Sequence, residues 1–205
     1  MVLNSKQKLL LFSDLHCDAA AASSLVARSQ EADILICAGD LATTRRRLNV
    51  CLDILQAITK PTVLVPGNNE SLEELAAACR GWPNAHVLHG SGVTINGIEY
   101  YGVGGGVPVT PFGDWSFDFT EEQATEMLSH CPVGGVLVSH SPPKGAVDVA
   151  SNGMSLGSTA VRTAVERVKP KLVVCGHIHG SAGQSARIGP TTVINAGPDG
   201  LVWPL

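Results

Sequence analysis

The sequence predicts an α/β protein in which strands and helices form layers. Short apolar runs alternate with longer segments of helical character, which is the strand-helix-strand order of layered α/β domains. The apolar runs are continuous, as is typical of parallel strands that are buried on both faces. A chain of 205 residues is also long enough to bury a sizeable core.

In the N-terminal part, three apolar runs are each followed by a predicted helix. We expect strands at KLLLFS (8–13), DILICAG (33–39) and TVLVPG (62–67), and helices at AAAASSLVARSQ (19–30), TRRRLNVCLDILQAI (44–58) and SLEELAAACR (71–80). These pairs establish the alternating order on which the predicted fold class depends.

The rest of the chain combines hairpins with further strand-helix units. Glycines and β-branched residues in 86–106 predict short antiparallel strands that end in a glycine-rich loop. A helix from about Thr120 to Ser129 precedes the next strand. Further elements are expected at 134–140 (strand), 158–168 (helix), 171–177 (strand) and 185–197 (a hairpin with a Gly-Pro turn).

Length, composition and charge limit the classes of function. Domains contain about 150 residues and no linker or repeat is visible, so we expect a single domain over residues 1–205. The 14 Lys and Arg against 18 Asp and Glu give a net charge of -4 and a pI near 5.9. Nucleic-acid binders carry a surplus of basic residues, so no stable nucleic-acid binding is expected. The sequence does not indicate an oligomeric state.

Cysteine usage and hydropathy predict a reduced, cytoplasmic protein without a membrane partner. The six cysteines have no CxxC spacing, and three lie in or beside apolar runs, where free Cys behaves as a small hydrophobe. The N-terminal apolar stretch is too short for a signal peptide and soon meets Asp14. No run approaches the ~18 apolar residues of a membrane span.

Five predicted strands end in residues that can ligate a metal ion. These residues are Asp14 and His16, Asp40, Asn68 and Asn69, His140, and His177 and His179. Ligands of open α/β sheets bind beyond the carboxyl ends of the strands, so we expect these side chains to converge. In D-x-H and H-x-H, an extended backbone places both side chains on one face.

Each of these residues also has a simpler explanation. A single Asp or His after a strand is more often a cap than a ligand, and GHIHG (176–180) also fits a turn. The joint pattern is harder to explain in that way. Seven of these residues are the candidate ligands: Asp14, His16, Asp40, Asn68, His140, His177 and His179. They offer carboxylate, imidazole and amide donors, which suit two divalent transition ions better than a structural zinc site.

In this order the motifs resemble those of the calcineurin-like metallophosphoesterases. The blocks D-x-H, G-D, G-N-H-[D/E], an isolated H and G-H-x-H of that family correspond to 14–16, 39–40, 67–70, 140 and 176–179. The match extends over nearly the whole chain. The resemblance implies a four-layer sandwich of two mixed β-sheets flanked by helices.

The resemblance also implies a binuclear metal centre that hydrolyses phosphoesters. By position, one ion takes Asp14, His16 and His179, the other takes Asn68, His140 and His177, and Asp40 bridges them. We expect manganese, with iron, nickel, zinc or cobalt as alternatives. Two cations about 3.5 to 4 Å apart can hold an attacking hydroxide, clamp a phosphate and stabilise the leaving oxygen. The neutral amide and imidazoles leave the centre positive, which favours an anionic ester.

The chain departs from the family at Asn69, where a histidine usually contacts the phosphate and can protonate the leaving oxygen. Asparagine cannot supply that proton, but its amide can donate a hydrogen bond to a phosphoryl oxygen, so Asn69 is a candidate catalytic residue. The Asn pair also fits a turn. Glu70, which can orient that histidine in the family, is then expected to be only an acid at a helix N-terminus.

These residues predict a phosphodiesterase with weak monoesterase activity. The preferred substrates have an acidic leaving group or a strained ester, as in a cyclic nucleotide. His86 and His89 are alternative sources of the missing acid by residue type, although both also fit a solvated turn or strand edge.

Three further segments are of interest. Arg45 to Arg47 could meet a substrate phosphate, although a solvated helix start explains them better. GVGGG (102–106) lacks the Lys and Ser or Thr of a P-loop, so we expect a flexible loop near the site. The aperiodic loop 141–158 is a candidate wall that sets substrate selectivity, and Lys144 and Asp148 within it have no assigned role.

Two other classes of function were weighed. A non-catalytic or weakly catalytic metal-binding scaffold for protein interactions fits the replacement at Asn69, but a scaffold need not keep seven ligands. A metal-dependent nuclease is disfavoured by the acidic charge and the small size. The sequence therefore favours an enzyme.

Overall fold

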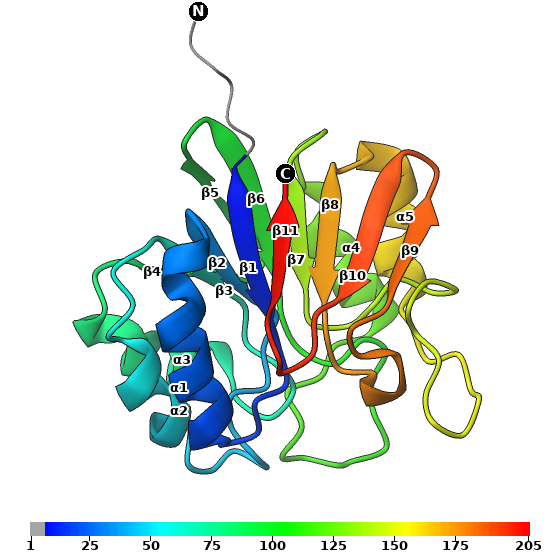
Figure 1. Ribbon diagram of the computed structural model, residues 1–205. Coiled ribbons are helices and arrows are strands. Elements are labelled where there is room, and N and C mark those ends of the chain that lie inside the picture. Colours follow the sequence, from blue (N-terminus) through cyan, green and yellow to red (C-terminus); the bar gives the residue numbers. More distant parts are fainter. Residues whose placement is uncertain (1–6) are drawn as a thin grey trace, which may run out of the picture.

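The computed structural model describes residues 7–205 as two β-sheets that pack face to face, with helices on the outer face of each (Figure 1). The predicted α/β fold with two mixed sheets flanked by helices is confirmed. The sequence of layers is helix, sheet, sheet, helix.

The first sheet contains five strands in the order β11-β1-β2-β3-β4. Its parallel strands are β1 (Lys8–Phe12), β2 (Ile34–Cys37), β3 (Thr62–Leu64) and β4 (Ala85–Val87), with β11 (Leu201–Pro204) antiparallel to β1. Its outer face is covered by α1 (Ala19–Arg28), α2 (Asn49–Leu55) and α3 (Leu72–Ala78). Short 3₁₀ helices, η1 (Ser29–Glu31) and η2 (Cys79–Gly81), follow α1 and α3.

The second sheet contains six strands in the order β5-β6-β7-β8-β10-β9. Its strands are β5 (Ser91–Ile95), β6 (Ile98–Val103), β7 (Val136–Ser139), β8 (Leu172–Cys175), β9 (Ser185–Ile188) and β10 (Thr191–Asn195). The four central strands are parallel, and β5 and β9 pair antiparallel at the two edges. The outer face is covered by α4 (Glu121–Ser129) and α5 (Thr159–Val168).

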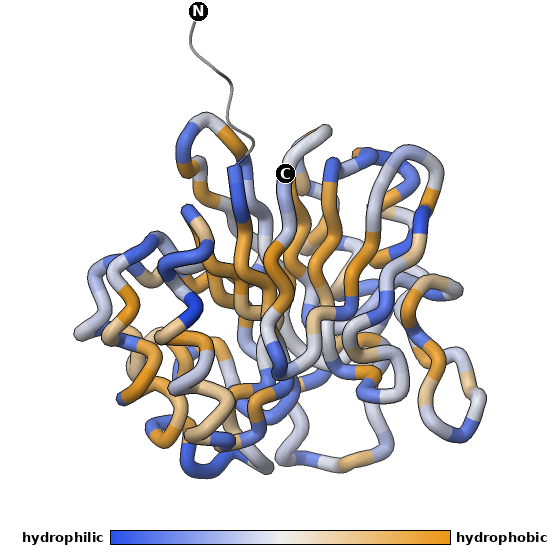
Figure 2. Tube along the Cα trace, in the orientation of Figure 1, coloured by the Kyte–Doolittle hydropathy of each residue, from blue (hydrophilic) through white to orange (hydrophobic). Residues whose placement is uncertain are grey.

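The central strands are apolar on both faces, which explains their continuous hydrophobic sequences. In β1, Leu9 and Leu11 face the second sheet, whereas Leu10 and Phe12 pack against the helices. All four side chains are fully buried. Figure 2 shows hydrophobic residues concentrated along these strands and hydrophilic residues mainly in the outer segments.

Three local predictions were wrong in position or missing. The helix predicted at 44–58 begins only at Asn49, because Thr44, Arg45 and Arg47 adopt positive φ angles that no α-helix allows. The predicted antiparallel strands of 86–106 are present as β5 and β6, but β4 joins the first sheet in parallel. The edge strand β11 was not predicted.

No helix within residues 7–205 combines the length and the apolar character that a membrane span requires.

The carboxyl ends of β1, β2, β3, β7 and β8 lie at the same end of the sandwich, which is the lower end in Figure 1. The loops that follow these strands therefore meet there.

Candidate metal centre

The seven candidate ligands converge at the carboxyl ends of the strands. Asp14 follows β1, Asp40 follows β2, Asn68 follows β3, His140 follows β7, and His177 follows β8. The remaining two, His16 and His179, lie in the loop after β1 and in the 3₁₀ helix η3 (His179–Ser181). Two groups of three side chains form, each with ligand atoms within 4.8 Å of one another.

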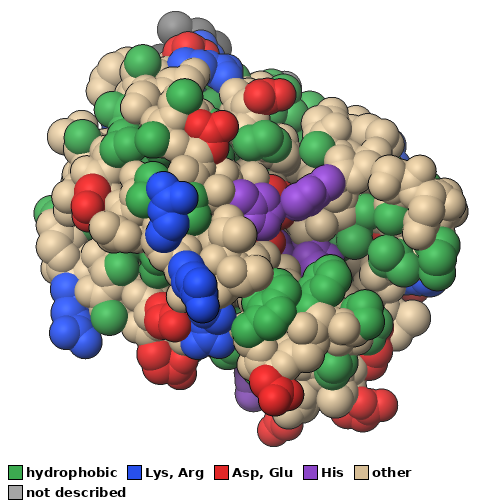
Figure 3. All heavy atoms as spheres, turned by 90° about the horizontal axis from the view of Figure 1, so that it is seen from below, with side chains coloured by type: hydrophobic (Ala, Val, Ile, Leu, Met, Phe, Trp, Pro, Cys, Tyr) green, Lys and Arg blue, Asp and Glu red, His purple; other side chains and the backbone are tan. Residues whose placement is uncertain are grey.

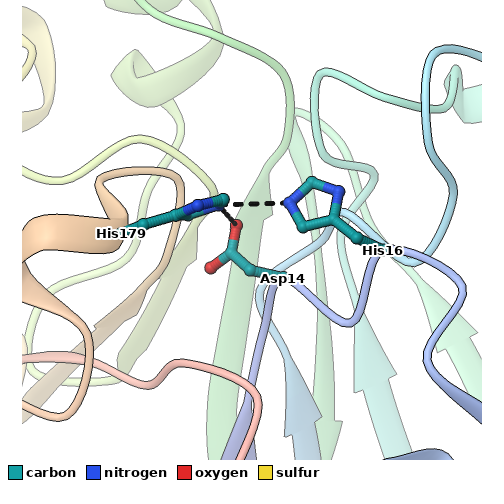
Figure 4. A group of neighbouring side chains, drawn as sticks. All are labelled: Asp14, His16 and His179. Atoms are coloured by element: carbon teal, nitrogen blue, oxygen red, sulfur yellow. Dashed lines mark hydrogen bonds and ion pairs between the residues drawn. The ribbon is translucent and has the colours of Figure 1, made fainter.

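The first group consists of Asp14, His16 and His179 (Figure 4). Nε2 of His179 lies 3.6 Å from Oδ1 of Asp14 and 3.1 Å from Nε2 of His16. Nδ1 of His16 donates to the carbonyl oxygen of Ala42 over 3.2 Å. Because this contact holds the ring proton on Nδ1, the Nε2 lone pair points into the group.

The second group consists of Asp40, His140 and His177, with Asn68 beside it. Nδ1 of His140 donates to the carbonyl oxygen of Ala38 over 2.7 Å, and Nε2 lies 3.2 Å from Oδ1 of Asn68. In the neutral ring, the same reasoning leaves the Nε2 lone pair of His140 free for a cation. The side chains of Asn68 and His140 are almost fully buried, so this group is less accessible than the first.

Asp40 lies between the two groups. Its Oδ2 is 3.6 Å from Nε2 of His16, and its Oδ1 is 3.5 Å from Nε2 of His140. One carboxylate thus faces both groups, which is the position that a bridging ligand needs.

The backbone around the ligands is strained and tightly packed. Asp14, Asp40 and His177 have φ angles of 58°, 59° and 67°, a region that residues with a side chain rarely adopt. Glycines precede two of these ligands for steric reasons. A Cβ at Gly176 would overlap Oδ2 of Asp14, and a Cβ at Gly39 would overlap the backbone of residue 67.

Glu70 holds the loops of the centre together. Its fully buried carboxylate accepts hydrogen bonds from the backbone N–H groups of Asp40 (2.8 Å), Ala42 (2.9 Å) and Gly67 (2.8 Å). The N-cap of α3 is Ser71. The expectation that Glu70 serves only as an acid at a helix N-terminus was therefore wrong.

Asn69 faces the carboxylate of Asp40. Its Nδ2 donates to Oδ2 and its backbone N–H donates to Oδ1 of Asp40, both over 2.8 Å. Its Oδ1 accepts from the backbone N–H of Thr44. The predicted contact with a phosphoryl oxygen stays a prediction, but this side chain does line the cavity described below.

The buried charges shift several pKa values. Burial raises the pKa of Asp40, but His140 and then His16 outweigh it, and the pKa falls below its ordinary value. Burial opposes protonation of His140, but Asp40 outweighs it and raises the pKa to about 9. Burial and then His140 lower the pKa of His177 to about 4. Burial and then Asp40 raise the pKa of Glu70 to about 7. Such opposed shifts in one cluster are typical of functional sites.

The donor set fits a pair of divalent cations. In the part of the chain that the structure describes, the carboxylates of Asp14 and Asp40 form ion pairs with histidines and with no Lys or Arg. Two carboxylates, an amide oxygen and four imidazoles, of which those of His16 and His140 have a fixed tautomer, are suitable ligands for divalent transition ions. The cysteine thiols do not take part in either group.

A cavity of about 640 Å3 opens over the centre. Asn69 and most of the seven candidate ligands contribute to its floor. The floor and the two sides are lined by His16, Asp40, Asn68, Asn69, His177, His179, Val107, Pro108, Val109, Thr110, Pro111, Phe112, Trp115, Ala150, Ser151, Met154, Leu156, Ile178 and Gly180. We call residues 107–118 the first wall and residues 149–156 the second wall.

Comparison with known proteins identifies the family. The model of the family described as calcineurin-like phosphoesterase matches residues 7–181. The chain belongs to this family. The resemblance that the five motifs indicated is therefore confirmed.

Curated relatives share the family but are longer. Metallophosphoesterase domain-containing protein 1 of Homo sapiens and that of Mus musculus are each 35% identical over 138 residues, which is 65% of this chain. The alignment spans 39% of the length of these relatives.

Solved structures of low sequence identity share the fold. A protein of Thermus thermophilus has a TM-score of 0.76 at 19% identity, covering 95% of this chain and 91% of that chain. A dimetal phosphatase from Danio rerio has a TM-score of 0.63 at 13% identity, covering 95% and 88%. At these identities, the likeness concerns the fold alone.

Two residues that could have replaced the family histidine lie away from the cavity. His86 is in β4, paired with Val63, and His89 accepts from the backbone N–H of Gly104 over 3.1 Å at its Nδ1. Neither lines the cavity. Burial lowers the pKa of His89, whose ring packs against Phe117 and Phe119. The idea that either residue supplies the acid is not supported.

The glycine-rich segment 102–106 was expected to be a flexible loop, but it is closely packed. The backbone N–H of Gly105 donates to the carbonyl oxygen of Pro66, and a Cβ at Gly104 would overlap Pro66. The three arginines of the basic run do not line the cavity either, and Arg45 forms an ion pair of 2.7 Å with Glu74.

The loop 141–158 contributes to the cavity, as expected of a wall. Asp148 organises it by accepting hydrogen bonds from the backbone N–H groups of Gly145 and Gly157 and from the hydroxyl of Ser155. Lys144 donates from Nζ to the carbonyl oxygen of Ser155. Both residues therefore stabilise the loop.

The sequence did not reveal the support of Asn68. Its Nδ2 donates to Oγ of Ser116 over 2.9 Å, and that hydroxyl donates to Oδ1 of Asp118 over 2.8 Å. These contacts turn Oδ1 of Asn68 toward His140. No motif connects residues 48 positions apart, so only the structure shows this relationship.

Proposed function

We propose that this protein is a binuclear metal-dependent phosphodiesterase with weak monoesterase activity. The observation that carries the proposal is the placement of Asp40 between two groups of ligands. In this assignment, one ion is held by Asp14, His16 and His179, and the other by Asn68, His140 and His177. Manganese is the metal we favour, with iron, nickel, zinc or cobalt as alternatives.

The chain's own residues would position the ions and the substrate. Bound divalent ions supply a nucleophile at neutral pH and neutralise the charge of the phosphate. Nδ1–H bonds of His16 and His140 to backbone carbonyls fix the rings, and Glu70 fixes the loops that carry Asp40 and Asn68. Nδ2 of Asn69 keeps a second N–H with only a long 3.5 Å contact to Oδ1 of Asn68, so this N–H is available to a phosphoryl oxygen.

The lining of the cavity favours esters whose leaving group needs no proton. Apart from the candidate ligands, no side chain among the described lining residues is an acid or a base. An alkoxide that leaves a monoester or a diester needs a proton, and general acid catalysis contributes about 10²- to 10⁴-fold. The preferred substrates therefore have an acidic leaving alcohol or a strained ring, such as aryl diesters or cyclic nucleotides.

The experiment compares two esters with the same leaving group. Metal-stripped protein reloaded with manganese is assayed with bis(p-nitrophenyl) phosphate and with p-nitrophenyl phosphate, alongside Asn69→His and His140→Ala. His130→Ala is the matched control, because His130 is exposed at the end of α4 and belongs to neither group of ligands.

We expect manganese-dependent hydrolysis of the diester, loss of activity in His140→Ala, and a gain of monoesterase activity in Asn69→His. Equal or faster hydrolysis of the monoester by the wild type would contradict the preference for diesters. No metal-dependent hydrolysis of either ester would favour the protein-interaction scaffold. A small phosphoester in the cytoplasm is the partner that the proposal requires.

A further inference from the structure

The two walls of the cavity are apolar above a polar floor. Val109, Phe112 and Trp115 contribute from the first wall, and Met154 and Leu156 contribute from the second wall. Phe112 is 52% exposed and Met154 is 56% exposed. Large exposed apolar side chains that cluster around a concave site are typical of binding surfaces.

The space-filling view shows part of this apolar lining beside the histidines on one face of the molecule. In Figure 3, histidines lie in a hollow, with a group of hydrophobic side chains on one side of it and Lys and Arg on the other.

None of the described residues that line the cavity is Lys or Arg. The guanidinium of Arg45 is engaged by Glu74 at 2.7 Å and lies 3.4 Å from the carbonyl oxygen of Trp115. Apart from the histidines of the metal groups, the cavity therefore offers no basic side chain to a second phosphate group.

The first wall is attached directly to a candidate ligand. The backbone N–H of Phe117 donates to the carbonyl oxygen of Asn68 over 2.9 Å, and Nδ2 of Asn68 donates to Ser116. The rings of Phe112 and Trp115 stack with their centroids 5.6 Å apart and their planes 15° apart. These contacts hold the first wall against Asn68.

The second wall is attached to the turn that carries His179. The hydroxyl of Ser181, in η3, accepts from the backbone N–H of Val149 over 3.1 Å and donates to its carbonyl oxygen over 3.0 Å. Gly180 lies so close to the backbone of Ala150 and Ser151 that a Cβ would overlap it. Both walls thus have fixed positions relative to the metal groups.

We propose that these walls bind an apolar alkyl or aryl ester group of a phosphodiester whose phosphate lies at the floor of the cavity. The inference rests on the proposed function, and it specifies the class of substrate. The cavity volume of about 640 Å3 is in the range of about 300 to 1,000 Å3 that holds whole organic ligands, well above the need of a phosphate group. The apolar walls and the lack of Lys and Arg among the described lining residues favour one phosphate with a hydrophobic substituent.

The test uses phosphinates, which mimic a diester but contain no ester bond to hydrolyse. Dimethylphosphinate and its relatives with one methyl replaced by butyl, hexyl or benzyl are titrated into the manganese-loaded protein by calorimetry at two temperatures. The variants are Phe112→Ser for the first wall and Met154→Ser for the second. Val133→Ser is the control, because Val133 is 78% exposed and lies outside the cavity.

We expect the Kd to fall by about two- to fourfold for each CH₂ from methyl to butyl, since burial of one CH₂ corresponds to about fourfold at most. The heat-capacity change of binding should become more negative as the chain grows. In the wild type, the Kd of dimethylphosphinate divided by the Kd of the butyl probe measures the chain-length effect. At least one of Phe112→Ser and Met154→Ser should reduce this ratio by threefold or more. The control Val133→Ser should leave the ratio unchanged. If the benzyl probe binds more tightly than the butyl probe, the ester group lies against the stacked rings of Phe112 and Trp115. If the butyl probe binds more tightly, the ester group lies against Met154 and Leu156.

The outcomes separate this inference from the proposed function. Equal Kd values for the methyl and butyl probes would overturn the inference, while manganese-dependent binding of dimethylphosphinate would leave the proposed function intact. A chain-length effect that persists in both variants would overturn the assignment to these walls. No manganese-dependent binding of any probe would overturn both proposals.

Discussion

The side-chain amide of Asn69 donates a hydrogen bond to Oδ2 of Asp40 over 2.8 Å. The residue that replaces the family's histidine therefore contacts the carboxylate that lies between the two metal groups. Its carboxamide is held from the other side by the backbone N–H of Thr44. Asparagine at this position thus has a structural role at the centre, besides any contact with substrate.

Replacement of Asn69 by Ala should weaken both metal binding and hydrolysis. Loss of a hydrogen bond to a ligating carboxylate typically costs about 10- to 100-fold in metal affinity or activity. We expect the loss of kcat/KM to be the same for aryl diesters of differing leaving-group acidity, because Asn69 donates no proton. Manganese titration and a series of substituted phenyl diesters test this. A loss that grows with the basicity of the leaving group would show instead that Asn69 contacts the leaving oxygen.

Ser116→Ala should lower the affinity of one metal site without unfolding the protein. The hydroxyl of Ser116 accepts from Nδ2 of Asn68 and is itself held by Asp118. Without it, the amide of Asn68 can rotate, and we expect a loss of about 10-fold in the affinity for the second ion. The measurement is a two-site manganese titration. Ser151→Ala is the control, since Ser151 lines the cavity but contacts no ligand side chain. Equal affinities in the two variants would refute the positioning role of Ser116.

The convergence of the candidate ligands could be predicted because each one lies within four residues of the end of an apolar strand. A buried parallel strand is visible in the sequence, and its carboxyl end is the place where side chains of several strands meet. Asp14, Asp40, His140 and His177 are all positioned in this way. Local sequence therefore contained most of the geometry of the centre.

The supporting contacts could not be predicted because their partners are distant in sequence and lie in irregular loops. From the sequence, Glu70 was expected to be an acid at the N-terminus of the following helix. In the structure, its carboxylate oxygens accept hydrogen bonds from the backbone N–H groups of Asp40, Ala42 and Gly67. The basic run looked like a helix start, but positive φ angles at Thr44 and Arg45 form a turn over Asn69. Strand β11 has no periodic signal, and it forms because β1 offers it an edge.

Glu70→Gln should destabilise the protein. Three backbone N–H groups point at the carboxylate, and in glutamine one acceptor oxygen becomes an NH₂ group that opposes a donor. We expect the free energy of unfolding to fall by about 2 to 3 kcal/mol, the range for a buried hydrogen bond to a charged group. Urea unfolding of the metal-free protein at pH 8, above the pKa of Glu70 of about 7, measures it. Glu73→Gln is the control, because Glu73 is exposed on α3. A change no larger than that of the control would show that Glu70 does not hold the loops.

Alkylation of the native protein should be confined to Cys17. All six cysteines are free. Burial raises the pKa of Cys51 and Cys79 to about 12 and the pKa of Cys131 to about 11. Burial also raises the pKa values of Cys37 and Cys175. The thiolate is the reactive form, so these five thiols should be inert at pH 8. Cys17 is partly exposed. Mass spectrometry after iodoacetamide treatment, with and without urea, should show one modified site in the native protein and all six in urea. Native labelling of any buried thiol would contradict the packing described for it.

Glu121→Gln should loosen the helix α5 without affecting the metal centre. The carboxylate of Glu121, at the start of α4, accepts from the hydroxyl of Ser158 (2.7 Å) and from the backbone N–H groups of Thr159 (2.9 Å) and Ala160 (2.7 Å). A negative charge at a helix N-terminus and its hydrogen bonds are together worth about 1 to 2 kcal/mol. We expect the free energy of unfolding to fall by that amount in urea, and the manganese affinity to stay unchanged, because α5 carries none of the seven candidate ligands.

The control for this change is Glu126→Gln in the same helix, where the exposed Glu126 side chain has no contact with α5. Amide hydrogen exchange in residues 159–168 adds a local measurement, since the first turn of α5 should exchange faster in Glu121→Gln than in the control. Equal exchange and equal stability in the two variants would show that Ser158 alone is enough to cap α5 through its hydrogen bond from Val161. A fall in manganese affinity would show that the packing of α4 on α5 reaches the centre through the loop that ends at Ser158.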